Sequence, residues 1–298
     1  MKGLAFCPAH VTGFFKAEIR EDLTDPQLLG SLGAGFSIQD GVTTKVQADY
    51  SENSGYRISI SGYGSEDTHV SEFVIKEFFK MAGGKRFFAD VKHEIAVPVG
   101  YGLGCSGAVA LSLAMALNEA LEMNLSKERV GQIAHAAEIN CKTGLGDVLA
   151  SYHGGFEIRT KPGAPGIGSL EKIESDTKAI LICFSPISTQ KFIDEKIETI
   201  NGLGGKMVSK LIQTKDYNDF QDMSLEFAKY VKVMTPKMNA VINDLQNNGI
   251  KAGIALFGET VFTLVPKSLE DKALEILKKY PDGTIIKSKI DNIGARLQ

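Results

Sequence analysis

What the sequence lacks excludes several classes of protein. It carries 33 Lys and Arg against 36 Asp and Glu, for a net charge of -3, and has no polybasic run, so we expect no nucleic-acid partner. No apolar window approaches the roughly 20 residues that a membrane span needs, and the N-terminus does not resemble a signal peptide. We therefore expect a cytoplasmic protein with no membrane partner.

Metal-binding and disulfide patterns are missing as well. The chain has four cysteines and five histidines, with no Cys-x-x-Cys pair and no His-Glu-x-x-His spacing. We expect the cysteines to be buried thiols. Any metal ion is expected to arrive with a ligand.

The length and the Pro/Gly content predict two domains. At 298 residues the chain exceeds the size at which a single core usually stops growing. The tract at 161–178 is the most polar and Pro/Gly-rich of the chain, and we place the boundary around it. This predicts an N-terminal domain at 1–168 and a C-terminal domain at 169–298.

Local patterns predict the elements of both halves. Alternating β-branched and polar residues at 36–60, with a turn at 53–55, predict a β-hairpin. Apolar periodicity predicts helices at 68–81, at about 106–121 and, capped by Ser126, at about 127–140. The order of strands and helices after 178 favours an α+β sandwich with helices on one face of an antiparallel sheet.

A glycine loop leads into the helix predicted at 106–121. Gly102, Gly104 and Gly107 form a G-x-G-x-x-G, but no acidic residue follows at the end of a next strand, which disfavours a dinucleotide site. A Walker A loop is excluded because no Gly-Lys-Ser/Thr follows. Two readings remain open: a nucleoside triphosphate held on the helix N-terminus, with the Ser106 hydroxyl near a phosphate or magnesium, or a tight turn whose glycines only permit packing.

Three segments resemble the motifs of the GHMP kinase superfamily, in the same order and over nearly the whole chain. They are "FCPAHVTGFF" at 6–15, "PVGYGLGCSGAVA" at 98–110 and "KAGIALFGETVF" at 251–262. The resemblance implies a two-domain α+β fold, with an N-terminal α/β domain that includes the hairpin strands and a C-terminal ferredoxin-like domain. It also implies ATP and Mg²⁺, with the ATP phosphates on Pro98, Gly100, Gly102, Leu103, Gly104, Cys105, Ser106 and Gly107.

Two motifs depart from the superfamily pattern. The first lacks the Gly-Glu-His tail of sugar kinases, and "PAHVTGFF" followed by "LLGSLGAGFSI" looks like the archaeal pantoate kinase branch. The third motif has Gly253 and Gly258 but no Gly-x-Gly-Gly.

Two carboxylates are the candidate catalytic groups. By resemblance, Glu138 would hold magnesium together with Ser106, and Asp147 would be the general base for the acceptor hydroxyl. Phosphoryl transfer has a loose transition state, so Asp147 could orient the hydroxyl rather than abstract its proton. The alternatives are a solvated helix carboxylate for Glu138 and a helix cap for Asp147.

The acceptor site is assigned in the same way. Arg159 ends a strand and suits a bidentate grip on a substrate carboxylate, or is a solvated charge. His135 lies three residues before Glu138 and shares its helical face, so it either points into the same cleft or is an ordinary hydrogen-bonded group. The resemblance adds Ser31 and Thr189, while His10 and Thr12 of the first motif are expected to form the floor. Apolar walls are expected from Phe14, Phe15 and Phe36.

The resemblance implies ATP-dependent phosphorylation of pantoate to 4-phosphopantoate in coenzyme A biosynthesis. Homoserine or mevalonate could be the acceptor instead, because such kinases would share the loop and both carboxylates. A nicotinamide-dependent oxidoreductase or an inert nucleotide-binding module are the alternatives outside the kinase class. A homodimer is expected only because dimers are common among such kinases.

Overall fold

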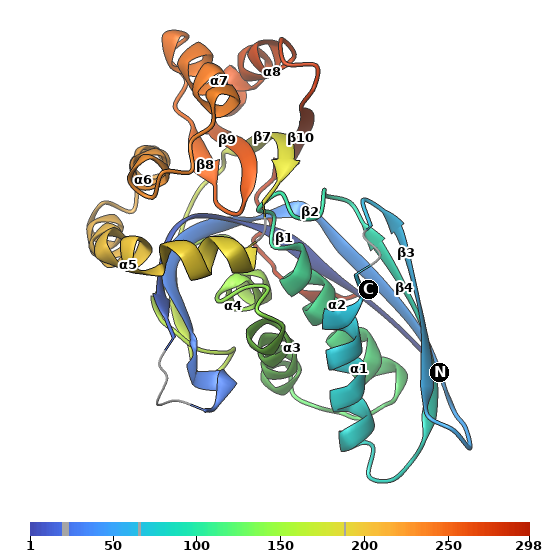
Figure 1. Ribbon diagram of the computed structural model, residues 1–298. Coiled ribbons are helices and arrows are strands. Elements are labelled where there is room, and N and C mark those ends of the chain that lie inside the picture. The colour runs from blue at the N-terminus through green and yellow to red at the C-terminus, as the bar shows by residue number, and fades with distance from the viewer. Residues whose placement is uncertain (20–23, 65–66, 188) are drawn as a thin grey trace.

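The chain is built on two β-sheets, each with helices packed against it (Figure 1). The structure is a computed structural model that describes residues 1–19, 24–64, 67–187 and 189–298, with the side chains of 189–195 outside that description. The predicted α+β class is confirmed. Among the described helices, none combines the length and apolar character needed to span a bilayer.

The larger sheet carries the N-terminal half of the chain and the last strand. Its strands are β1 (Lys2–Glu18), β2 (Gly30–Tyr50), β3 (Gly55–Gly62), β4 (Phe87–Ile95), β5 (Phe156–Lys161), β6 (Ser169–Ile173) and β11 (Arg296–Leu297). The order is β11-β1-β2-β4-β3, with β5 paired to β2 and β6 to β5. Long β1 and β2 pair antiparallel over most of their lengths, so the first motif, which lies within β1, runs through the middle of the sheet.

The predicted hairpin at 36–60 is wrong, although both of its strands exist. β4 lies between them, antiparallel to β2 and parallel to β3. Strand β4 buries Phe87, Ala89, Val91 and His93 on one face, whereas β3 is half-buried at best and forms the sheet edge. A parallel pair needs a crossover connection, which the helix between β3 and β4 supplies.

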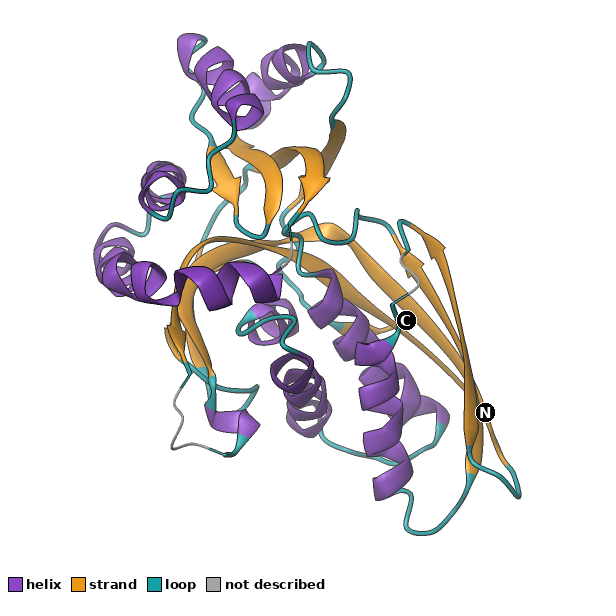
Figure 2. Ribbon diagram, in the orientation of Figure 1, coloured by secondary structure: helices purple, strands orange, loops and turns teal. Residues whose placement is uncertain are grey.

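Four helices cover one face of this sheet: α1 (His69–Met81), α2 (Cys105–Ala120), α3 (Lys127–Cys141) and α4 (Asp147–His153), shown in purple in Figure 2. The predictions for the first three are confirmed with ends shifted by about a residue. Helix α2 contacts β1 and β2 on one side and α1 and α3 on others, which explains why it is apolar nearly all round. The Ser126 hydroxyl caps α3 by accepting from Arg129 N at 3.2 Å.

The smaller sheet has the ferredoxin-like arrangement predicted from the sequence. Its strands are β7 (Lys178–Pro186), β8 (Gly253–Ala255), β9 (Gly258–Val265) and β10 (Thr284–Lys289), all antiparallel in the order β10-β7-β9-β8. Helices α7 (Pro236–Asn247) and α8 (Glu270–Leu277) pack against it. The short 3-10 turns are η1 (Pro26–Leu28) and η2 (Lys267–Leu269).

Helices α5 (Thr189–Thr214) and α6 (Tyr217–Tyr230) join the two sheets. Both pack on β1, and α6 also packs on β8 and β9. The ring of Phe220 on α6 contacts Phe14 and Phe36 of the large sheet and Phe262 of the small one, with centroids 5.9, 6.2 and 5.6 Å away. The sheets share this aromatic core, and a division between 168 and 169 would separate β6 and β11 from the sheet to which they belong.

Candidate active site

The glycine loop before α2 is fixed by hydrogen bonds from both sheets' sides of the molecule, one from His10 and one from Ile187. Gly100, Gly102 and Gly104 have φ angles of +85°, +77° and +59°, a region that favours glycine. His10 N donates to Leu103 O at 3.1 Å, and Ile187 N donates to Gly100 O at 2.9 Å. The loop therefore holds the N-terminus of α2 in one position relative to both sheets.

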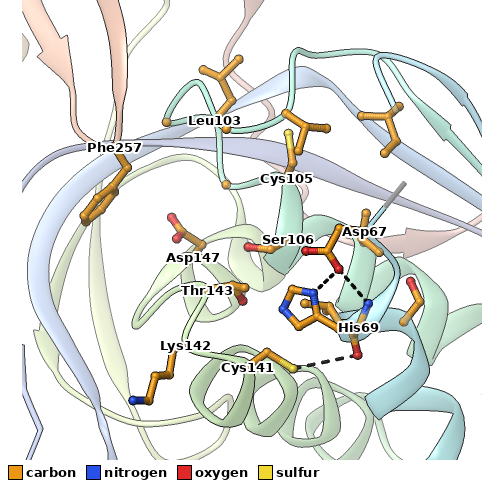
Figure 3. Close-up of a pocket in the computed structure, with 18 of the residues that line it drawn as sticks. Asp67, His69, Leu103, Cys105, Ser106, Cys141, Lys142, Thr143, Asp147 and Phe257 are labelled. Carbon is orange, nitrogen blue, oxygen red and sulfur yellow. Dashed lines mark hydrogen bonds and ion pairs between the residues drawn. The ribbon is translucent and has the colours of Figure 1, made fainter. Parts of the chain in front are cut away.

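A cavity of about 390 Å³ opens at this helix N-terminus. It is lined by the loop, the start of α1, residues 141–143 at the end of α3, and Phe257 in the turn between β8 and β9. Ser106 is half-buried there, and Figure 3 shows Asp147 between Ser106 and Phe257. Six of the predicted phosphate residues line the cavity (Gly100, Gly102, Leu103, Gly104, Cys105 and Ser106), whereas Pro98 and Gly107 do not.

Glu138 is completely buried beneath the cavity, which excludes the solvated-carboxylate reading. Its Oε2 accepts from Val148 N at 3.2 Å, while Oε1 has no hydrogen-bond partner within the described part of the chain. Burial, and then the nearby Asp147 carboxylate, raise the pKa of Glu138 to about 8. A Cβ added at Gly107 or Gly144 would lie 3.0 or 2.2 Å from Oε1, so these glycines leave space around an unpartnered oxygen.

Asp147 is the first residue of α4, with its side chain 15% exposed. The helix is capped by Gly146 without a side-chain hydrogen bond, and the carboxylate that accepts from its first turn belongs to Glu138. Capping therefore does not explain Asp147. Its Oδ1 instead accepts from His10 Nδ1 at 2.7 Å.

A small recess adjoins the cavity and shares Thr12, Asp147 and Phe257 with it. Its other lining residues are Phe15, Ser31, Gly144, Leu145, Gly146 and Arg159. A Cβ added at Gly146 would lie 2.5 Å from Ser31 Oγ and 2.8 Å from Arg159 Nε. Gly146 thus keeps open the space that the hydroxyl and the guanidinium face.

Arg159 is 1% exposed, so it is not a solvated charge. Its Nη1 donates to Glu157 Oε1 at 2.5 Å, and its Nε has no partner among the residues that the structure describes. Buried, part-satisfied guanidinium groups are unusual because leaving a donor unpaired is costly. The free donor beside the recess is therefore available to an acceptor group on a ligand.

Several predicted residues lie outside both hollows. His10 is fully buried behind Asp147 and lines neither, so it is not part of the acceptor floor, whereas Thr12 lines both. His135 Nε2 donates to Leu29 O at 3.0 Å, and burial lowers the pKa of its imidazole. Thr189 begins α5, but its side chain lies outside the described residues.

Only one of the three expected phenylalanine walls is in place. Phe14 and Phe36 are fully buried in the core around Phe220, whereas Phe15 lines the recess. The second apolar wall is Phe257, whose ring centroid lies 5.4 Å from that of Phe15. The third motif pointed to the segment of Phe257 but not to its side chain.

Other lining residues were missed by the sequence reasoning. Asp67 and His69 form an ion pair at one wall of the cavity, and His69 lowers the pKa of Asp67 (Figure 3). Lys142 and Thr143, which follow α3, also line the cavity. Glu157 shares a strand face with Arg159, because alternate residues of a strand point the same way, and this spacing could have identified it.

The described residues contain no group of three or more His, Cys, Asp or Glu side chains arranged to hold a metal ion. A magnesium ion at this site would take most of its ligands from a bound nucleotide and water, which is usual for Mg²⁺ beside phosphates. The unpartnered Oε1 of Glu138 and the half-buried hydroxyl of Ser106 are oxygen donors of the type that it prefers.

Comparison with known proteins places this architecture in a family. Residues 69–155, which include the loop and both carboxylates, match the GHMP kinases N terminal domain. A pantoate kinase of Methanocaldococcus jannaschii is 34% identical over 92% of this chain and 96% of its own, and one of Methanospirillum hungatei is 30% identical over 97% and 94%. A solved structure described as a phosphotransferase related to the CoA biosynthesis pathway is similar in fold, with a TM-score of 0.88 at 24% identity, over 100% of this chain and 99% of its own. The chain therefore belongs to the GHMP kinase superfamily and, within it, to the family of these pantoate kinases.

Proposed function

We propose that this protein transfers the γ-phosphoryl group of ATP to the 4-hydroxyl of pantoate, giving 4-phosphopantoate for coenzyme A biosynthesis. One observation carries the proposal: Asp147 lies on the wall shared by the cavity at the glycine loop and the recess that holds Ser31 and Arg159. A nucleotide in the cavity and a hydroxy acid in the recess would meet at this carboxylate. The relatives named pantoate kinase support the choice of acceptor.

The nucleotide side relies on backbone groups rather than on a loop lysine. The free N–H groups and the dipole at the N-terminus of α2 favour phosphate oxygens. Ser106 and Glu138 would hold Mg²⁺, which when bound neutralises charge on the β- and γ-phosphates. Of the described residues that line the cavity, Lys142 is the only lysine, and it stands at the mouth with an exposed side chain.

The acceptor side has groups for the carboxylate, the two methyl groups and the 4-hydroxyl of pantoate. Arg159 would bind the carboxylate, with Ser31 as a second donor. The Phe15 and Phe257 rings supply apolar surface for the two methyl groups. In the transfer the 4-oxygen bonds to the γ-phosphorus as the bond to the β-phosphate oxygen breaks. ADP leaves, and the hydroxyl proton passes toward Asp147.

Homoserine and mevalonate are the alternative acceptors, since an arginine and a carboxylate in these positions would also suit them. His135 and Thr189 stay predictions: His135 lines neither hollow, and the side chain of Thr189 lies outside the described residues. The cytoplasmic location and the homodimer belong to the proposal and rest on the likeness to such kinases alone.

The test is magnesium-dependent release of ADP from ATP, with pantoate, homoserine, mevalonate and galactose offered separately. We expect turnover with pantoate only, lost in Asp147→Ala and weakened mainly through KM for pantoate in Arg159→Ala. Turnover with another acceptor would support the proposed mechanism but would rule out pantoate as the substrate. Nucleotide binding without turnover on any of the four would favour the non-catalytic module.

A further inference from the structure

The two residues that act on the acceptor are joined behind the recess by a buried chain of charges. Asp147 Oδ1 lies 2.7 Å from His10 Nδ1, His10 Nε2 lies 3.1 Å from Glu157 Oε1, and that oxygen lies 2.5 Å from Arg159 Nη1. His10, Glu157 and Arg159 are each at most 1% exposed. This series of charged groups runs from α4 through β1 to β5, so it connects the three elements that carry Asp147, His10 and Arg159.

We propose that His10 and Glu157 are a positioning pair for phosphoryl transfer, holding the Asp147 carboxylate and the Arg159 guanidinium in one fixed relative orientation. Neither residue lines the cavity or the recess, so neither touches the reactants. This rests on the proposed function for the identity of the reactants, but the pair itself is defined by contacts among protein groups alone.

The distances favour a protonated His10. A neutral imidazole that donates from Nδ1 to Asp147 would present a lone pair at Nε2, which would repel Glu157 Oε1 at 3.1 Å and could accept only from Arg159 Nη1 at 3.4 Å. The imidazolium donates from both nitrogens, and the nearer contact is then the favourable one. With His10 charged, the series of four groups holds two positive and two negative charges and has no net charge. With a neutral His10 it would carry a net negative charge in the protein interior.

The surroundings of His10 agree with this charge state. The groups that face it are Asp147 on α4, Glu157 and Arg159 on β5, and the Thr12 hydroxyl on β1, while the Glu138 carboxylate on α3 lies beyond them. Burial alone lowers the pKa of His10, but Glu157 and Asp147 outweigh it and raise that pKa to about 9.

The pair also decides what Asp147 can do. Its Oδ1 is occupied by His10, and its Oδ2 has no hydrogen-bond partner among the described residues, so one oxygen remains for the acceptor hydroxyl. That oxygen can orient the hydroxyl before its proton moves, and this suits a loose transition state in which deprotonation comes late.

Glu157 constrains the Arg159 side chain, as His10 constrains that of Asp147. Glu157 Oε1 accepts from Nη1 of the guanidinium, which fixes the guanidinium from one end, while Nε lies beside Gly146 with no partner among the described residues. Without Glu157 the arginine would lose the carboxylate that pairs with it in the described part of the chain, and its donors would no longer be oriented toward a substrate carboxylate.

The first test compares Glu157→Gln and His10→Asn with Asp291→Asn. Asp291 is also a buried carboxylate paired with an arginine, Arg296 at 3.0 Å, but it lies at the C-terminal end of the chain, outside both hollows. For the two positioning variants we expect kcat/KM for pantoate to fall roughly 10- to 100-fold, with KM for ATP changed less than about twofold. Asp291→Asn should lower the melting temperature with kcat/KM nearly unchanged. If Glu157→Gln and His10→Asn also lower only the melting temperature, the positioning role is overturned.

The second test does not depend on turnover. Nitrogen-15 NMR of the imidazole rings, with the His10 signals assigned by their loss in His10→Asn, should show an imidazolium at pH 8 in the unsubstituted protein and a neutral ring at that pH in Glu157→Gln. A neutral His10 at pH 7 in the unsubstituted protein would overturn the pair. If pantoate gives no turnover but His10 is charged and depends on Glu157, the proposed function fails while the charged pair stands.

Discussion

Gly102 in the phosphate loop packs directly on Leu256 in the turn between β8 and β9: a Cβ at position 102 would lie 2.2 Å from the Leu256 carbonyl oxygen. Beside this contact Leu256 N donates to Thr12 O at 3.0 Å, and Thr260 Oγ1 donates to Tyr101 O at 2.9 Å. The first, second and third sequence motifs therefore meet at one point, and the small sheet helps to shape the loop at which the phosphates would bind.

Gly102→Ala should weaken ATP binding as well as stability. The residue has φ +77°, and its added Cβ would face backbone atoms that are held in place by the fold. We therefore expect the free energy of unfolding to fall by well above the roughly 1–2 kcal/mol that a left-handed φ alone costs. The KM for ATP should rise about tenfold or more, because the loop must shift away from the turn. Thermal unfolding and steady-state kinetics measure the two effects.

Gly84→Ala is the matched control for that substitution. Gly84 has φ +84°, and a Cβ there would meet nothing within 4 Å. It should show the backbone cost alone, with unchanged KM for ATP. Equal losses of stability in the two variants would mean that the loop does not depend on the Leu256 turn.

Gly146→Ala should close the recess and leave the nucleotide cavity intact. The new methyl group would overlap the space beside Ser31 Oγ and Arg159 Nε, at a φ of -150° that lies outside the left-handed region favouring glycine. We expect kcat/KM for pantoate to fall by about 100-fold or more, while ATP still binds with nearly the same affinity. Gly205→Ala, a helical site whose Cβ would meet only the flexible Lys16 side chain, is the control and should leave both parameters unchanged. Unaltered pantoate kinetics in Gly146→Ala would place the acceptor elsewhere.

Glu138→Gln should stabilise the magnesium-free protein while abolishing turnover. The folded-state pKa is about 8 against an ordinary 4.5, so between these values the folded state holds a proton that the unfolded chain has lost. Stability contributed by this group is therefore lost as pH rises from 4.5 to 8, and glutamine removes that loss. The melting temperature of the variant should exceed that of the unsubstituted protein by a margin that grows between pH 5 and pH 8, with kcat reduced at least about 100-fold. The exposed Glu119 is the control site, where Glu119→Gln should leave the melting temperature unchanged at each pH. If the melting temperature of Glu138→Gln differs from that of the unsubstituted protein by the same amount at every pH, ionising the buried Glu138 has no cost.

Local signals explain which parts of the fold the sequence could predict. The three helices were found because caps such as Ser126 and apolar periodicity act over a few residues. The hairpin prediction was wrong because strand order is not local: the chain bends at 52–53 between the two strands, but β3 pairs with the later strand β4 rather than with β2. The β6 and β11 pairings were missed for the same reason, since their partners are set by the sheet as a whole.

The features of the candidate site also differ in whether the local sequence could predict them. Glycines with required conformations, and carboxylates in the motif context, could be named from the sequence. The burial of Glu138, the recess around Arg159 and the position of His10 behind Asp147 could not, because each depends on strands and helices distant in the chain. The phenylalanines show the limit most plainly: Phe14 and Phe15 are neighbours in the sequence, yet one lies in the aromatic core and the other on the recess wall.

Phe257 should set the preference for an acceptor with two methyl groups. It is held at φ +67°, which is strained for an aromatic residue, and it lines both the cavity and the recess opposite Asp147. Pantoate and 2,4-dihydroxybutanoate differ only in the two methyl groups, each of which contributes roughly 0.8 kcal/mol when buried. We expect the ratio of kcat/KM for these two acceptors to fall about 10- to 20-fold in Phe257→Gly, with KM for ATP little changed.

Backbone relief is the confounding effect, because glycine removes the strain at φ +67° while it removes the ring. Lys232 also has a positive φ, +56°, in the turn after α6 and away from both hollows. Lys232→Gly should therefore reproduce the stabilising part of the change, about 1 kcal/mol, and leave the acceptor ratio unchanged. If Phe257→Gly keeps the unsubstituted ratio, the methyl groups do not contact this ring, and Phe15 alone would have to supply the wall.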